Sequence, residues 1–274
     1  MTKERQSDDL GRMSFTGHLK ELRERLVVSV AAIVVCFAIT YYYAVEVYMI
    51  LSEPLLPALP EDQRFLAFTG VVEPFFTYLK AAFVAAIIMA SPVLLFEAWA
   101  FVAPGLYRGE RKWFAPVVVA SFLLFILGVY FGYKVVFPIG FKYLLSFAGP
   151  ELKPVLSMGA YFSLATKLLI AFGIVFQLPL VILVLARLGI VDAPMLIGWW
   201  RYALLLSIVV GAVLTPPDVF SQLLMGGPIM ILYGLGIIIA MLFGKKKPGV
   251  PEDEEEEEED DPWSIKKKTD DGES

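Results

Sequence analysis

Long stretches without a charged residue are the feature that most constrains what this chain can fold into. They cover residues 26–44, 81–96, 113–133, 168–186, 202–214 and 219–243, and none contains Lys, Arg, Asp or Glu. A helix needs about 20 predominantly apolar residues to cross a bilayer. Because 58% of the chain is hydrophobic, these stretches are too many and too long for one soluble core. The sequence predicts an all-α integral membrane protein with six transmembrane helices.

The fifth stretch is short for a membrane span. Residues 202–214 make thirteen residues, or about 20 Å of helix, whereas the hydrocarbon core is about 30 Å thick. Pro216 and Pro217 cannot continue the hydrogen-bond ladder. Asp218 then stands where it can N-cap the sixth span by accepting from the amide of Ser221 or of the residue before it. We expect this turn to lie below the usual outer surface of the bilayer.

The basic residues predict the orientation. Six spans place both termini on one side, and the segments flanking the spans on that side carry fourteen Lys and Arg residues against four on the other. The positive-inside rule therefore predicts that both termini are cytoplasmic. No cleavable signal peptide is evident, so we expect the first span to act as an uncleaved anchor.

Three segments are expected along the chain. Residues 1–25 form a cytoplasmic segment, residues 26–243 form the membrane domain, and residues 244–274 form a disordered cytoplasmic tail. The first segment contains a short amphipathic helix, because one apolar stripe recurs at helical spacing; it consists of Phe15, Leu19, Leu22 and Leu26. The acidic run 252–261 in the tail is too highly charged to pack, and such runs are usually solubilising.

Few residues could support catalysis or metal binding. His18 and Cys36 are the only histidine and cysteine, which excludes a HExxH zinc site and an intramolecular disulfide. Neither a GxSxG nor a GxxxxGK[ST] motif occurs. We therefore expect a protein that is not an enzyme and that needs no cofactor or metal.

Two alternative classes stay open. A membrane-embedded hydrolase could use Ser163 and Lys167, which lie four residues apart on one helix face. A small-solute secondary transporter would also fit six spans. Such transporters typically show internal repeats and broken helices around a midplane site, and no repeat between the two halves is evident here.

Two features within the spans indicate close helix contacts. The sequence GVYFG, residues 128–132, fits the GxxxG pattern, whose small residues let another helix approach closely. Gln177 lies midway along the fourth span, two residues before Pro179. An amide at this depth needs a hydrogen-bond partner, either within this chain or on a helix of another protein. Lys80 and Glu97 lie at the ends of the second span, where long side chains can reach the interface.

Four motifs together resemble one known family. They are HLKELRERL at 18–26, SPVLLFEAWAFVAPGLYRGERK at 91–112, FGIVFQLP at 172–179 and LTPPDVFSQ at 214–222. In this order, over residues 13–243, the chain resembles the TatC family of the twin-arginine protein translocase.

The resemblance implies a glove-shaped, concave bundle with short fifth and sixth spans in the bacterial inner membrane. A protein of this kind binds twin-arginine signal peptides of folded cargo proteins at its cytoplasmic face. It exports the cargo together with single-span partners of the TatA and TatB type and with other copies of itself. Export draws on the proton motive force and involves no nucleic acid.

The resemblance assigns signal-peptide binding to the carboxylates of Glu21, in HLKELRER, and Glu110, in LYRGERK. Arg23, Arg25 and Phe101 belong to the same cytoplasmic patch. Two carboxylates suit two adjacent guanidinium groups, because each planar fork can be bound bidentately. Two simpler interpretations stay open: Glu21 could only pair with Arg25 four residues on, and Glu110 could only complement the dipole of the third span.

The resemblance also assigns positions outside this patch. Pro54 matches a family position in the first external loop, and Asp218 and Gln222 match the last external turn. Many members of the family have glutamate at the position of Gln177. Since glutamine carries no charge, we expect Gln177 to dock a polar residue of a partner's span by hydrogen bonding.

Overall fold

The computed structural model describes residues 15–59, 65–102, 114–147, 155–215 and 218–244, and within these ranges the chain is almost entirely helical. Five of the described helical segments are long and apolar enough to cross a membrane, and one further apolar helix, Trp200–Leu214, is shorter. The long segments are Gly17–Tyr42, Glu73–Val102, Phe114–Ser146, Met158–Arg187 and Val219–Phe243. The expectation of six spans with a short fifth span is confirmed.

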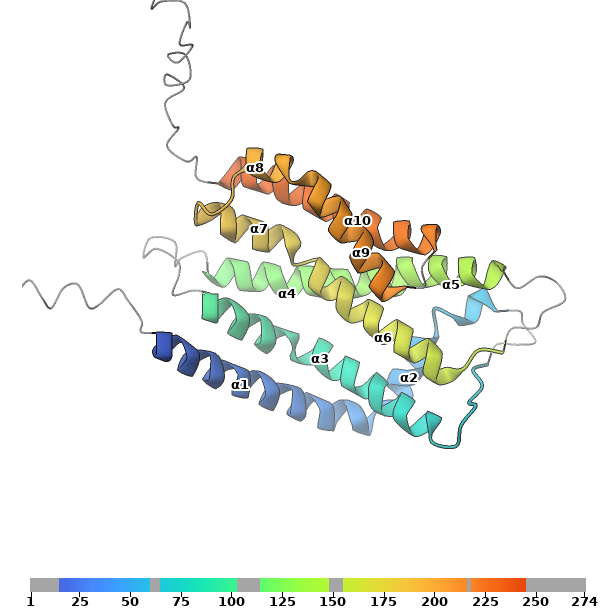
Figure 1. Cartoon of the computed structure of the whole chain (residues 1–274). Coiled ribbons are helices and arrows are strands. Elements are labelled where there is room, and N and C mark those ends of the chain that lie inside the picture. The colour runs from blue at the N-terminus through green and yellow to red at the C-terminus, as the bar shows by residue number, and fades with distance from the viewer. Residues whose placement is uncertain (1–14, 60–64, 103–113, 148–154, 216–217, 245–274) are drawn as a thin grey trace, which may run out of the picture.

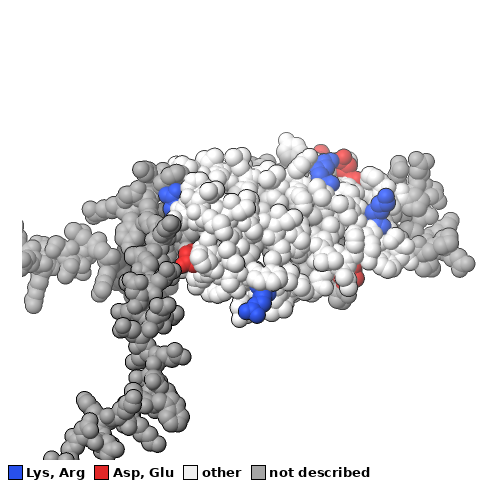
Figure 2. Space-filling view, turned by 90° about the horizontal axis from the view of Figure 1, so that it is seen from above, with Lys and Arg blue, Asp and Glu red and all other residues white. Residues whose placement is uncertain are grey.

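The helices form one elongated bundle, in which the first helix begins and the last helix ends at the same end (Figure 1). We call this the terminal end, and the other the opposite end. Figure 2 shows a face that is almost entirely uncharged, with Lys, Arg, Asp and Glu confined to a few small patches. Such a surface suits contact with lipid, where an exposed charge is costly.

The first two spans pack side by side as an antiparallel pair. α1 (Phe15–Tyr42) is one uninterrupted helix, so the amphipathic segment and the first span are continuous. It lies along α3 (Glu73–Val102). The hydroxyl of Thr40 donates to the carbonyl of Ala82 at 2.7 Å, which satisfies a buried polar group within the pair.

The third span is longer than the sequence indicated. α4 (Phe114–Phe131) continues through a π-helical turn (Gly132–Val136) into α5 (Phe137–Ser146). Residues 137–146, which lie beyond the charge-free run 113–133, are therefore helical and extend this span. The wider π turn ends at Val136, two residues before Pro138, which falls in the first turn of α5. Proline cannot donate to the preceding turn and its ring clashes with a regular α-helical turn, so the change of hydrogen-bond register in the π turn is what accommodates it.

The fourth span is broken and packs tightly on the third. α6 (Met158–Val175) and α7 (Leu178–Arg187) are separated by a turn at Phe176 and Gln177. A Cβ added at Gly128 would lie 2.5 Å from the carbonyl oxygen of Phe172 on α6. The GxxxG pattern thus allows a close helix approach within this chain, as expected.

The last two spans form a hairpin of unequal arms. α8 (Ala193–Gly198) leads into α9 (Trp200–Leu214), which has 15 residues and is about 22 Å long. α10 (Val219–Phe243) has 25 residues, so the expectation of a short sixth span is not met. The reason is that no residue between 219 and 243 is charged and Pro228 does not interrupt the helix.

The opposite end of the bundle is capped by short elements. α2 (Ala44–Ser52) and the 3-10 turn η1 (Leu56–Ala58) join the first two spans. Pro54 is buried in the turn between them, beside Leu55, which is fully buried. Pro54 and Pro57 lie in this connection, and prolines disfavour a long regular helix there.

A single carboxylate joins two connections at the opposite end of the bundle. Glu73, the first residue of α3, accepts from the amides of Thr69 at 2.6 Å and Gly159 at 2.6 Å, and from the hydroxyl of Ser157 at 2.5 Å. Ala67 and Ser157 also form an isolated β-bridge. The start of α6 is thereby held to the segment before α3.

Candidate functional site

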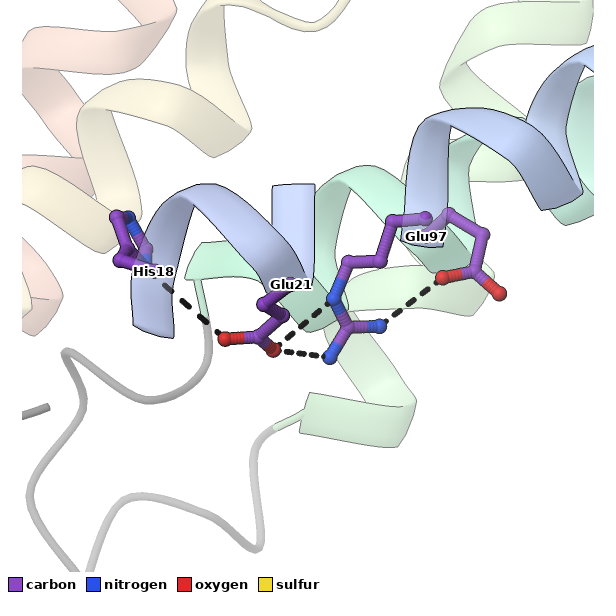
Figure 3. A network of polar contacts seen from close by, with 4 residues as sticks. His18, Glu21 and Glu97 are labelled. Carbon is purple, nitrogen blue, oxygen red and sulfur yellow. Dashed lines mark hydrogen bonds and ion pairs between the residues drawn. The ribbon is translucent and has the colours of Figure 1, made fainter. Parts of the chain in front are cut away.

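A guanidinium lies between two carboxylates where α1 passes the last turns of α3, at the terminal end (Figure 3). Arg25 donates from Nε and Nη2 to Oε1 of Glu21, at 3.1 and 2.6 Å. Its Nη1 donates to Oε2 of Glu97 at 3.0 Å. The side chains of Arg25, Glu21 and Glu97 are 25%, 17% and 15% exposed. One positive and two negative groups give this half-buried site a formal charge of −1.

The rotation of α1 about its axis explains why these polar side chains are half-buried. The leucines of the predicted apolar stripe, Leu19, Leu22 and Leu26, are 50%, 44% and 60% exposed. They face away from the bundle, as expected for a helix that presents leucines to lipid or to another protein. The polar side of the same turns, with Glu21 and Arg25, therefore faces α3.

Glu21 keeps one oxygen without a donor. Its Oε2 is buried and has no hydrogen-bond partner within the described residues. Nδ1 of His18 lies 3.9 Å away, which is too long for a hydrogen bond. The imidazole of His18 stacks on the ring of Phe101, with 4.3 Å between ring centroids. The free oxygen of Glu21 therefore lies next to a small aromatic surface, at which a further cation could be bound.

The structure brings together some of the residues that the resemblance assigned to one patch. Glu21 and Arg25 are in direct contact, and Phe101 is linked to them through His18. Arg23 is exposed on α1. Glu110 lies outside the described residues, so its distance from Glu21 is not part of this geometry.

Glu97 is the polar residue of this site that the sequence interpretation missed. It was expected only to reach the interface, yet it binds Arg25 from a position 72 residues away along the chain. The available signal was a carboxylate that interrupts the apolar run LLFEAWAF near the end of a span. Its pairing with Arg25 depends on which faces of α1 and α3 are turned toward each other, and this cannot be read from the sequence.

Gln177 has hydrogen-bond partners within its own chain. Its Oε1 accepts from the hydroxyl of Ser121 on α4. Its Nε2 donates to the carbonyl of Ser121 at 3.1 Å and to that of Gly173 at 3.4 Å. Gln177 also lines an apolar groove, together with Val181 of α7 and Leu206 of α9. The amide thus stabilises the break between α6 and α7 while one side of the residue faces a groove.

Asp218 and Gln222, which the resemblance assigned to the last turn, both make contacts at the start of α10. Asp218 N-caps α10 by accepting from the amide of Ser221 at 2.8 Å, as predicted. Gln222 donates to the carbonyl of Ile208 on α9 at 3.2 Å. Oδ1 of Asp218 is buried and has no hydrogen-bond partner among the residues that the structure describes.

Candidates for other chemistry are few in the described part of the chain. No group of three or more His, Cys, Asp or Glu there could hold a metal ion. Ser163, considered above as a nucleophile beside Lys167, accepts a hydrogen bond from Lys80 of α3 at 2.9 Å. This contact joins the second and fourth spans.

Comparisons with known proteins agree on one family. The family model described as "Sec-independent protein translocase protein (TatC)" matches residues 17–228. The chain is 46% identical over 239 residues to the Sec-independent protein translocase protein TatC of Desulforapulum autotrophicum, covering 87% of this chain and 88% of the relative. It is 38% identical over 237 residues to the TatC protein of Aquifex aeolicus, covering 86% and 98%.

Comparison with solved structures identifies the same family by its fold. The crystal structure described as "Twin Arginine Translocase Receptor- TatC" superposes with a TM-score of 0.75 at 36% identity, covering 82% of this chain and 98% of that one. Fold and site therefore define a multi-pass helical membrane protein with an acidic, half-buried guanidinium site at the terminal end. The chain belongs to the TatC family of Sec-independent protein translocase proteins.

Proposed function

We propose that this chain binds twin-arginine signal peptides at the terminal end of its bundle, and that this end faces the cytoplasm. Glu21 binds the guanidinium of one peptide arginine and Glu110 binds that of the other. Arg23, Arg25 and Phe101 belong to the same patch. The observation that carries this proposal is that Glu21 already binds a guanidinium, that of Arg25, in a half-buried position.

A carboxylate in this setting favours arginine over lysine. The guanidinium fork can donate two parallel hydrogen bonds to one carboxylate, whereas an ammonium acts as a point charge. Partial burial increases the difference, because an unpaired N–H or oxygen is costly away from water. The stacked rings of His18 and Phe101 beside Glu21 add an aromatic face, and guanidinium groups bind such faces well.

The wider function is proposed on the family resemblance. The chain works with single-span partners of the TatA and TatB type and with other copies of itself, and exports folded proteins across the inner membrane using the proton motive force. Gln177 and the groove beside it are proposed to dock a partner's span. Pro54, Asp218 and Gln222 shape the external surface used in assembly.

Peptide binding by the purified chain in nanodiscs tests the central step. We expect a twin-arginine peptide to bind at least about tenfold more tightly than its twin-lysine version, a difference of the size of one charge-assisted hydrogen bond. Glu21→Gln and Glu110→Gln should each remove this preference. Glu24→Gln is the matched control, because Glu24 lies on the same helix, is 67% exposed and pairs only with Lys20 at 4.0 Å among the described residues.

Two results would count against the proposal. Equal affinity for both peptides would mean that this chain does not recognise arginine. A preference for arginine that survives both Glu21→Gln and Glu110→Gln would place recognition elsewhere in the molecule.

A further inference from the structure

The guanidinium site described above is already occupied. Arg25 uses two of its nitrogens on Oε1 of Glu21, at 3.1 and 2.6 Å. A peptide arginine that is to be held bidentately needs both oxygens of the same carboxylate. Binding at Glu21 therefore requires that Arg25 first release Oε1.

Releasing Arg25 is costly unless its guanidinium finds another anion. The side chain is 25% exposed, and an unpaired charge that is partly shielded from water is unfavourable. Glu97 meets this need, because its Oε2 binds Nη1, a nitrogen that Glu21 does not use. Arg25 can thus leave Glu21 and stay paired.

Glu21 has a second oxygen that is available for the exchange. Its Oε2 is buried and without a hydrogen-bond donor within the described part of the chain. An incoming guanidinium can reach this enclosed oxygen when a neighbouring side chain such as His18, 3.9 Å away, moves aside, and it can do so while Arg25 still occupies Oε1. The second bond then forms as Arg25 withdraws, so neither oxygen of Glu21 has to be left unpaired during the exchange.

We propose that Arg25 is a built-in competitor for the peptide arginine at Glu21, and that Glu97 is the positioning residue that receives Arg25 when the peptide binds. This inference rests on the proposed function, and it gives Arg25 and Glu97 roles in selectivity. A ligand must displace a guanidinium, which a second guanidinium can do because it also offers Glu21 two N–H donors. An ammonium ion replaces a bidentate fork with a point charge, so lysine is rejected.

The test is a double-mutant cycle on full-length protein in nanodiscs, read out as the affinity for twin-arginine and twin-lysine peptides. Glu97→Gln alone should weaken twin-arginine binding by roughly tenfold, since displaced Arg25 loses its charged partner. Adding Arg25→Gln to Glu97→Gln should restore the affinity to the wild-type value or better, because the competitor is gone. In this double variant the twin-lysine peptide should gain more than the twin-arginine peptide. Lys20→Gln and Glu24→Gln, at exposed positions of α1, are matched charge controls.

Each outcome distinguishes the inference from its alternatives. If Arg25 and Glu97 only hold α1 to α3, the double variant will bind no better than Glu97→Gln alone, and the inference is overturned. An unchanged affinity of Glu97→Gln has the same consequence. If the wild-type chain does not prefer arginine, or if Glu21→Gln binds normally, the proposed function itself fails.

A measurement on the wild-type chain avoids any effect of substitution on folding. Nε of Arg25 bonds only Glu21, whereas Nη1 bonds only Glu97, among the described residues. With ¹⁵N-labelled arginine, the Nε–H resonance of Arg25 should therefore shift on saturation with twin-arginine peptide, while the Lys20→Gln control behaves as wild type. A resonance that stays unchanged at saturation would show that Arg25 does not leave Glu21.

Discussion

Gln177 and Ser121 exchange hydrogen bonds across the interface of the third and fourth spans: the serine hydroxyl donates to the amide oxygen, and the amide nitrogen donates to the serine carbonyl at 3.1 Å. Both residues lie within apolar segments, where an unsatisfied polar group is costly. The pair thus stabilises the bundle at the point where α6 gives way to α7, whatever further role Gln177 has.

Replacing Gln177 should have two effects that can be measured independently, one on the stability of the chain and one on its association with partners. Gln177→Leu leaves the hydroxyl of Ser121 without its acceptor, so we expect a loss of about 1–3 kcal/mol in the free energy of unfolding. If Gln177 also docks a partner, this variant should weaken association with TatA- or TatB-type subunits more than Ser121→Ala does. Twin-arginine peptide binding should be equal in both variants. Co-purification and peptide titration measure the two effects, and a selective loss of peptide binding would contradict the docking role.

The close packing of the third and fourth spans depends on glycine. A Cβ at Gly128 would meet the backbone oxygen of Phe172 at 2.5 Å, and a backbone atom cannot move aside as a side-chain tip can. We expect Gly128→Ala to destabilise the chain by about 1–3 kcal/mol. Gly234→Ala in α10 is the control, because nothing lies within 4 Å of its added Cβ. Thermal unfolding in detergent measures both, and equal unfolding temperatures would show that α4 and α6 can separate without cost.

Two substitutions of Asp218 distinguish its role as the N-cap of α10 from a need for its negative charge. Asp218→Ala removes the acceptor for the amide of Ser221, so we expect a loss of about 0.5–2 kcal/mol in stability. Asp218→Asn keeps an oxygen acceptor and should retain stability. If export in a reconstituted system is lost in both variants, the charge itself is needed; if only Asp218→Ala is impaired, capping is the role.

The role of Glu73 in joining the two connections at the opposite end can be tested by hydrogen exchange. Glu73→Ala removes the acceptor for the amides of Thr69 and Gly159, so we expect both amides to exchange at least about tenfold faster through local opening. Glu46→Ala, an exposed position in the first turn of α2, is the control. Unchanged exchange at Gly159 would mean that the β-bridge of Ala67 and Ser157 holds the connection alone.

The fold was predictable from the sequence where one local property decides it. Charge-free runs marked the spans, since a charge within lipid is costly, and the aspartate after two prolines marked the start of α10. The extension of the third span through residues 137–146 was not predictable in this way. Pro138 ordinarily signals a break, and only the preceding π turn makes it compatible with a continuing helix.

The site was predictable only in part, for a geometric reason. The pairing of Glu21 with Arg25 follows from their spacing on one helix. The contact of Arg25 with Glu97 depends on which faces α1 and α3 turn toward each other, and helix–helix rotation is a property of the packed bundle. Likewise, the partner of Gln177 lies 56 residues away, and no local pattern points from one residue to the other.

The hydrogen bonds of Glu73 with Ser157 and Gly159 determine when, during synthesis, the two connections can be joined. The carboxylate is synthesised more than eighty residues before its partners on the start of α6. While the ribosome makes the third span, Glu73 can accept from the amides of Thr69 and Gly70, but Ser157 and Gly159 have not yet been synthesised. The segment before α3 can be held to the start of α6 only after the fourth span has been made. In a chain truncated after the third span, this segment should therefore be exposed to proteases.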